Sequence, residues 1–153
     1  MNQVMSKNYQ AMKQYQGAGM KTVVEDATPH RLIQMLMDGA LDKIASARGF
    51  MERGDLAQKG AHISWAVSII DGLRVSLDKS VGGEIAQNLE DLYAYMMMRL
   101  TEANLNNKTE NLDEVAGLLR QIKGAWDAIP DEIIREHARK KQVADAVGKS
   151  YGQ

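Results

Sequence analysis

Residues 27–54, ATPHRLIQMLMDGALDKIASARGFMERG, are predicted to form one long helix. Apolar residues recur there at intervals of three and four, which is typical of an amphipathic helix. Thr28 suits the N-cap, and Pro29 suits the first helical position, where a backbone N–H would have no partner. Gly54 is able to end the helix in the left-handed conformation. The apolar positions are Leu32, Met35, Leu36, Ala40, Ile44, Ala47 and Met51.

Two further segments continue this periodicity. The second predicted helix begins at Asp55, which forms a capping-box pair with Gln58. It stops before the break at Gly82 and Gly83, because adjacent glycines punctuate helices. The third predicted helix runs from about residue 84 to about residue 105.

The fourth predicted helix begins with a capping-box pair of Asn111 and Glu114. It runs to about Trp126, and Pro130 ends it or lies just beyond its end. Few β-branched runs and few turn clusters argue against sheets. Four amphipathic helices of similar length with short connections favour an up-down arrangement. We therefore predict an all-α fold, an antiparallel up-down four-helix bundle.

The two ends of the chain differ from this bundle. Residues 1–28 are predicted to form a flexible N-terminal arm, with a possible short docking helix up to about Gln16. Residues 29–129 form the predicted helical bundle domain. Residues 130–153 are predicted to be a partly helical, mobile C-terminal tail.

Composition narrows the classes of function. The chain has 153 residues, which suggests one domain, and its net charge of −1 gives no field that would attract nucleic acid or an anionic membrane. It has no cysteine, which excludes disulfides and thiol catalysis. No apolar segment resembles a signal peptide, and none approaches the roughly 18 residues of a membrane span. A cytoplasmic protein without membrane insertion or nucleic-acid binding is expected.

No constellation of catalytic or metal-binding residues is recognisable. A di-iron site in a helix bundle needs Glu-x-x-His pairs, and none of His30, His62 and His137 has a glutamate three residues before it. The glycines at 82–83 lack the lysine and the serine or threonine of a phosphate loop. We therefore predict no catalytic residue, no cofactor and no metal, and a protein that is not an enzyme.

The stretch YAYMMMRL, residues 93–100, carries more apolar side chains than one buried stripe can use. A helix turns about 100° per residue, so Tyr93 and Met96 join the stripe while Met98 points nearly away from it. Methionine is flexible and adapts to varied partners. The pattern therefore indicates a helical binding module. The remaining apolar or amphipathic side chains off the main stripes are Tyr95, Met97, Met37 and Trp65.

Three stretches resemble the flagellin-specific export chaperones, the FliS family. ATPHRLIQMLMDGALDKIASA (27–47) is similar to the opening helix of that family. SIIDGLRVSLDKSVGGEIAQNLEDLYAYMMMRLTEANLNN (68–107) is similar to its second hairpin, including the GGEIA turn. LDEVAGLLRQIKGAWDAI (112–129) is similar to its fourth helix. The resemblance covers residues 29–129 almost continuously.

The resemblance implies a cytosolic chaperone for flagellar type III export. Such a chaperone binds the C-terminal segment of flagellin, which is disordered in the free subunit, and prevents its premature polymerisation. It also keeps flagellin competent for the flagellar export gate and for filament assembly. No ATP is needed, since the binding energy comes from burial of the client helix's apolar face in a groove.

These implications place a client-facing groove on the third helix, extended by the second. The N-terminal arm would cover the groove when it is empty, and Tyr15 stands at a suitable distance before Pro29 to be the family's N-terminal tyrosine. The predicted partner-binding residues are Tyr15, Met20, Ile70, Arg74, Tyr95, Met97 and Met98.

Two other classes of function fit the same residues. One is a self-associating structural helical bundle that would use the same surface. The other is a helical adaptor that binds another flagellar or regulatory protein. A helical enzyme, a metal carrier or a nucleic-acid-binding tail is less compatible with the spacings.

Overall fold

The computed structural model describes residues 27–151, with side chains up to residue 148. This part of the chain contains five helices and no strand. The predicted all-α fold is confirmed for it, while Tyr15, Met20 and the possible short helix up to Gln16 lie outside the described residues. The helices are α3 (Pro29–Glu52), α4 (Leu56–Val75), α5 (Lys79–Asn106), α6 (Thr109–Asp127) and α7 (Asp131–Tyr151).

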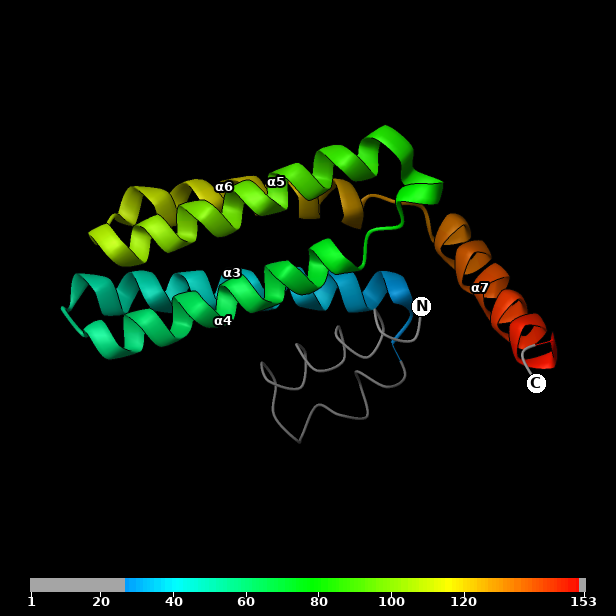
Figure 1. The fold of residues 1–153 in the computed structure, drawn as a ribbon, viewed down its shortest axis with the longest axis horizontal. Coiled ribbons are helices and arrows are strands. Elements are labelled where there is room, and N and C mark those ends of the chain that lie inside the picture. Colours follow the sequence, from blue (N-terminus) through cyan, green and yellow to red (C-terminus); the bar gives the residue numbers. More distant parts are fainter. Residues whose placement is uncertain (1–26, 152–153) are drawn as a thin grey trace.

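Helices α3 to α6 lie along the long axis of the molecule, and each runs opposite to the one before it (Figure 1). Contacts join α3 to α4, α4 to α5, α5 to α6, and α6 back to α3. Helix α7 leaves this group at one end and points away from it (Figure 1). The described residues thus hold five helices, one more than the four that the sequence predicted.

Both capping signals around α3 act as predicted. The Thr28 side chain accepts a hydrogen bond of 3.1 Å from the backbone N–H of Arg31, and Pro29 occupies the first turn. Gly54 follows the helix with φ of 77°, a left-handed conformation that costs glycine little. Asp55 then caps α4 by accepting a hydrogen bond of 3.1 Å from the backbone N–H of Gln58.

Replacing Thr28 with alanine is expected to lower the free energy of unfolding by about 1 kcal/mol, because one backbone N–H at the start of α3 loses its partner. Urea denaturation followed by circular dichroism measures this change. The matched control is Thr28→Ser, which keeps the hydroxyl and should stay close to wild type. Equal losses for both variants would show that the cap does not contribute through its oxygen.

The core fills the space enclosed by the four packed helices. Each fully buried aliphatic side chain contributes roughly 1.5–3 kcal/mol relative to exposure. The largest side chains with almost no exposed surface are Leu36, Met37, Ile63, Ile69, Ile70, Leu73, Met96, Leu100, Leu112, Leu119 and Val115.

Met37 is therefore a core residue, and its prediction as an off-stripe surface group is wrong. Its side chain is only 1% exposed. Helix α3 contacts α4 on one side and α6 on the other, so its buried face is wider than a single stripe. Trp65 packs partly buried against the same core, with the Lys43 Nζ 3.7 Å from the centre of its ring.

Helix α5 begins earlier than predicted. Asp78 caps its first turn by accepting hydrogen bonds from the backbone N–H groups of Ser80 and Val81. The predicted break is nevertheless present as a kink at Gly83, whose φ of 54° and ψ of −124° are not helical. A short helical turn precedes the kink, and the long straight part of α5 follows it.

The predicted capping box of Asn111 and Glu114 is wrong. Helix α6 begins at Thr109, and its N-cap residue, Lys108, makes no side-chain capping bond. Asn111 is a buried polar residue, and both it and Glu114 bind Arg99 of α5 instead. The two residues have the spacing of a capping box, but their side chains bind Arg99 of α5 instead of the backbone at the start of α6.

Polar contacts fasten the two ends of the packed helices. At one end the His30 and Trp126 rings stack at 4.9 Å, and the Trp126 indole N–H donates to the His30 carbonyl at 3.0 Å. At the other end the buried Lys59 Nζ donates to the Asn104 carbonyl at 2.9 Å and to Asn107 Oδ1 at 2.6 Å. Because these bonds join α3 to α6 and α4 to α5, they fix the register of the helices.

The tail that was predicted to be partly helical forms one continuous helix. Helix α7 has 21 residues and starts directly after Pro130. Its first turn carries Asp131 and Glu132, which favour a helix N-terminus. The helix is therefore longer and more regular than the sequence indicated.

Candidate partner-binding surface

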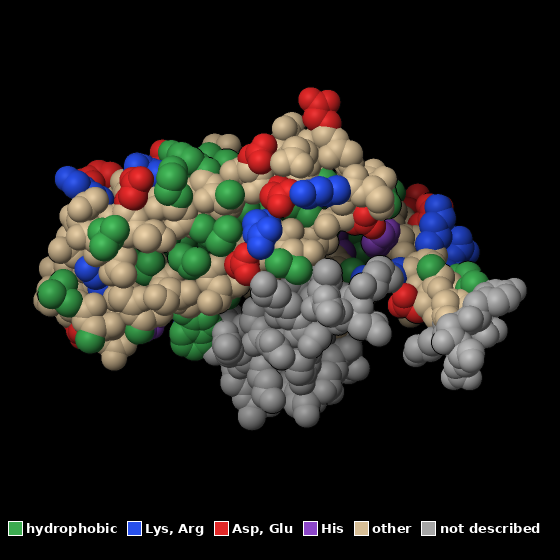
Figure 2. Space-filling view, in the orientation of Figure 1, with side chains coloured by type: hydrophobic (Ala, Val, Ile, Leu, Met, Phe, Trp, Pro, Cys, Tyr) green, Lys and Arg blue, Asp and Glu red, His purple; other side chains and the backbone are tan. Residues whose placement is uncertain are grey.

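The outward face of α5 carries exposed apolar side chains beside fully buried ones. Met98 is 51% exposed and Leu105 is 76% exposed, whereas Met96 and Leu100 have no exposed surface. Met98 and Leu105 are two helical turns apart and share one side of the helix. Hydrophobic side chains gather over α4 and α5 in the half of the molecule away from α7 (Figure 2). This face is a candidate surface for binding another protein.

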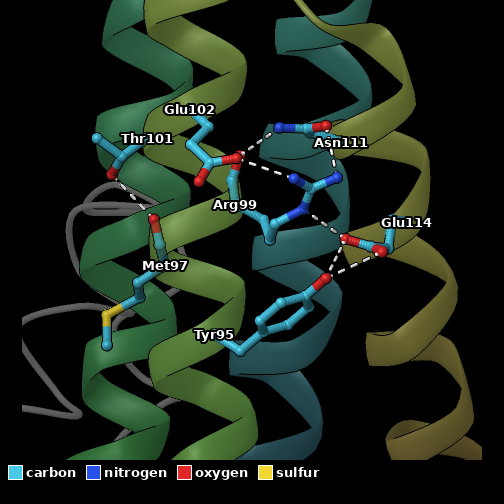
Figure 3. Close-up of polar contacts among 7 residues, drawn as sticks. All are labelled: Tyr95, Met97, Arg99, Thr101, Glu102, Asn111 and Glu114. Atoms are coloured by element: carbon cyan, nitrogen blue, oxygen red, sulfur yellow. Dashed lines mark hydrogen bonds and ion pairs between the residues drawn. The ribbon is translucent and has the colours of Figure 1, made fainter.

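The three predicted residues of α5 do not form one cluster. Tyr95 points toward α6, while Met97 lies on the opposite side of α5 (Figure 3). Met97 is half-buried and packs against the core, and its carbonyl accepts a hydrogen bond from the Thr101 hydroxyl at 2.9 Å. Met98 lies between them around the helix, since successive positions differ by about 100°. Tyr95 and Met97 therefore flank the exposed face that Met98 centres.

Tyr95 is held by a polar cluster between α5 and α6 (Figure 3). Its hydroxyl donates to the Glu114 carboxylate, with oxygen–oxygen distances of 2.9 and 3.1 Å. Arg99 Nε donates to the same carboxylate at 2.7 Å. Arg99 Nη2 donates to Asn111 Oδ1 at 2.7 Å, and the Asn111 amide donates back to the Arg99 carbonyl at 3.2 Å. We call Tyr95, Arg99, Asn111 and Glu114 the α5–α6 polar cluster.

The polar cluster shifts the titration of its members. Hydrogen bonds from Arg99 and then from Tyr95 lower the pKa of Glu114. The same carboxylate raises the pKa of Tyr95, because it accepts a hydrogen bond from the protonated hydroxyl and repels the phenolate. Tyr93, two residues away, faces the core instead, and burial raises its pKa to about 12. The cluster therefore keeps Glu114 ionised and Tyr95 protonated, which preserves the bond between them.

The Glu114→Gln variant is expected to lose stability near neutral pH but not in acid. Because folding lowers the pKa of Glu114, its contribution is fully present above the unfolded pKa of about 4.3. The contribution is lost as the pH falls through the lower folded value. The urea midpoints of wild type and variant should therefore converge as the pH falls below the lowered pKa of Glu114 in the folded protein.

Glu110→Gln is the matched control, since it removes the same charge from α6 outside the polar cluster. A difference between wild type and Glu114→Gln that stays constant down to strong acid would contradict the assignment of the lowered pKa to this cluster.

The two predicted residues of α4 occupy different environments. Ile70 has no exposed surface and belongs to the core cluster. Arg74 is partly exposed and lies between α4 and α5, with ion pairs of 2.9 Å to Asp71 and 3.5 Å to Glu90. Lys79 pairs with the same Glu90 carboxylate. Arg74 therefore contacts α5 through Glu90, whereas Ile70 lies in the core, and their role in partner binding stays a prediction.

Sequence reasoning missed two features of this surface. Leu105 is the more exposed partner of Met98, and its spacing of seven residues from Met98 is a signal that could have identified it. The polar cluster has no such signal, because its four members come together only through the register of α5 against α6.

Among residues 27–148 no group of three histidine, aspartate or glutamate side chains is placed to hold a metal ion.

In the part of the chain that the structure describes, no helix has both the length and the apolar character of a membrane span.

Comparison with known proteins assigns the chain to a class. The helical fold with an exposed apolar face fits a protein that binds other proteins. The family described as "Flagellar protein FliS" matches residues 11–133, which is most of the chain.

Individual relatives agree with the family match. The "Flagellar secretion chaperone FliSB" of Pseudomonas aeruginosa is 54% identical over 119 residues, which is 78% of this chain and 94% of that protein. The "Flagellar secretion chaperone FliS" of Salmonella typhimurium is 44% identical over 129 residues, 84% of this chain and 96% of that protein. The Bacillus subtilis protein of the same name is 34% identical over 103 residues, 67% of this chain and 76% of that protein.

This chain belongs to the FliS family of flagellar secretion chaperones. The resemblance stated from the sequence motifs is thereby confirmed. The family consists of chaperones, so the prediction that the protein is not an enzyme is confirmed as well.

Proposed function

We propose that this protein binds the C-terminal segment of flagellin in the cytoplasm, prevents its premature polymerisation and keeps it competent for export. The observation that carries the proposal is the exposed apolar face of α5, where Met98 and Leu105 lie outside a core that is already filled. Membership in a family of flagellar secretion chaperones supports an export role for the protein.

The binding mode we propose is an amphipathic client helix laid along α5. Burial of apolar surface on both partners supplies the energy, so no nucleotide is required. A client that is disordered when free costs about 2–5 kcal/mol or more to order, and a single pocket would not compensate for that cost. The proposed contact is therefore extended. It runs along α5 from the level of Arg74 and Tyr95, past Met98, to Leu105.

Side-chain chemistry along this path suits varied turns of a client helix. Met97 and Met98 have three rotatable side-chain torsions each and adapt their shape. Tyr95 supplies a rigid ring that the polar cluster holds in place. In this proposal α3, α4, α5 and α6 form one antiparallel four-helix bundle. The other three helices pack against the buried side of α5 and leave its outward face free for the client. Tyr15 and Met20 cover the α5 face when no client is bound, and Ile70 supports it from below.

A polymerisation assay tests the proposal. Monomeric flagellin seeded with filament fragments is followed by light scattering in the presence of increasing amounts of this protein. We expect polymerisation to stop when the ratio approaches one to one, because each chaperone masks one C-terminal segment. With the Met98→Asp variant, flagellin should polymerise nearly as fast as it does without any chaperone. Unimpeded polymerisation with the wild-type protein in excess would contradict the proposed function.

A further inference from the structure

Helix α7 exposes apolar side chains that the other described helices do not cover. Ile133, Val143 and Val147 are 56%, 59% and 49% exposed. Ile133 and Val147 are separated by four helical turns and Val143 is one turn from Val147, so the three share one side of the helix. The FliS family match ends at residue 133, so nearly all of α7 lies beyond the part of the chain that the family explains.

Helices in proteins take most of their stability from tertiary packing of an apolar face. The exposed apolar side of α7 is therefore expected to pack against a partner surface. The charges of the helix indicate which surface that is.

The two halves of α7 carry opposite charge. Residues 131–138 contain three acidic side chains and one basic one, and residues 139–148 contain three basic side chains and one acidic one. An acidic first turn by itself stabilises the helix dipole. The dipole does not explain the exposed apolar side chains, however, and those need a partner surface. The charged residues are Asp131, Glu132, Arg135, Glu136, Arg139, Lys140, Lys141 and Asp145.

We propose that the partner is a second copy of this chain, with the two α7 helices packed antiparallel. An antiparallel pairing places the acidic half of each helix beside the basic half of the other. If the pair is centred near residue 138, Ile133 lies level with Val143 of the second copy. The same register brings Glu136 level with Lys140 of the second copy. One register therefore pairs Ile133 with Val143 and Glu136 with Lys140.

A parallel pairing is disfavoured by the same residues. It would place Lys140 beside Lys140 and Glu136 beside Glu136, and like charges in contact are destabilising. Within each copy Glu136 and Lys140 already form an ion pair of 3.1 Å on this side of the helix. In the antiparallel pair these two ion pairs become one cluster of four alternating charges.

Sedimentation equilibrium of the full chain over a range of concentrations tests the proposal. We expect the apparent mass to rise to twice the monomer mass. The double variant Ile133→Asp, Val143→Asp should raise the dimer Kd by about tenfold or more. The matched control is Leu56→Asp, because Leu56 is equally exposed, at 61%, but lies at the start of α4. A monomer at all concentrations, or a dimer that the double variant leaves intact, would overturn the proposal.

Helix content and charge are tested separately. If the double variant lost helical circular dichroism, the Lys140→Glu variant would replace it, and the added change Glu136→Lys should restore dimerisation. Failure of the second change to restore the dimer would contradict the proposed charge pairing.

The orientation is measured by disulfide trapping, since the chain contains no cysteine. Separate Ile133→Cys and Val143→Cys variants are mixed and oxidised. We expect a disulfide that joins the two different variants. Disulfides only between identical variants would overturn the antiparallel arrangement. These experiments contain no flagellin, so their result is independent of the proposed chaperone function.

Discussion

The Met96→Asp variant is expected to lose about 4 kcal/mol or more of its free energy of unfolding, because an ionised carboxylate would be buried without a partner. The Met96 side chain has no exposed surface and belongs to the core between the four packed helices. Natural domains have only about 5–15 kcal/mol of stability in total, so the variant should be largely unfolded or close to it. Urea denaturation followed by circular dichroism measures the loss.

Met96→Leu is the control for this prediction. It keeps the volume and apolar character of the side chain, and such swaps usually cost less than about 1.5 kcal/mol. A Met96→Asp protein that denatures at the same urea concentration as wild type would show that Met96 does not face the core.

The Met98→Asp variant should show the opposite behaviour. Met98 is 51% exposed, so the free energy of unfolding should change by no more than about 0.5 kcal/mol. Affinity for flagellin should fall by about tenfold or more, because the carboxylate would be desolvated at the centre of the proposed contact. Calorimetric titration measures the affinity, and thermal unfolding measures the stability.

Val81→Asp is the matched control for Met98→Asp. Val81 is 82% exposed on the same helix, but it precedes the kink at Gly83 and lies outside the proposed contact. It should bind flagellin with wild-type affinity. Unchanged binding by Met98→Asp, or an equal loss in both variants, would contradict the placement of the site on the outward face of α5.

The opposite behaviour expected of Met96 and Met98 could be predicted from the sequence because it depends only on helix geometry. Two positions two residues apart differ by about 200° around a helix. Once Leu100 and Met96 are assigned to the core, Met98 has to face outward, and the structure confirms that exposure. The caps at Thr28 and Asp55 were predictable for the same reason, since each involves residues within one turn.

Features that depend on the pairing of helices could not be predicted in this way. Glu114 has the spacing of a capping residue, but its partners are Arg99 and Tyr95 of the preceding helix. Met37 lies off a single ideal stripe, yet two neighbouring helices bury it. In both cases the decisive neighbour is distant in sequence, and a local pattern contains no information about it.

Helix α7 shows a different limit of sequence reasoning. Its charge density suggested a tail that is only partly helical, because many charged residues usually indicate a segment without a packed core. Opposite charges one turn apart, such as Glu136 and Lys140, instead support a helix. The pattern of charge therefore predicts the structure of this segment better than its amount of charge does.

Calorimetric titration with full-length flagellin and with flagellin that lacks its C-terminal segment shows whether this protein acts on that segment. We expect tight binding, near one to one, for full-length flagellin and no detectable heat for the truncated flagellin. Titration of another FliS-family chaperone with its own flagellin under the same conditions provides the functional control. Equal binding of both flagellins, or of neither, would contradict the claim that this chaperone acts on the C-terminal segment.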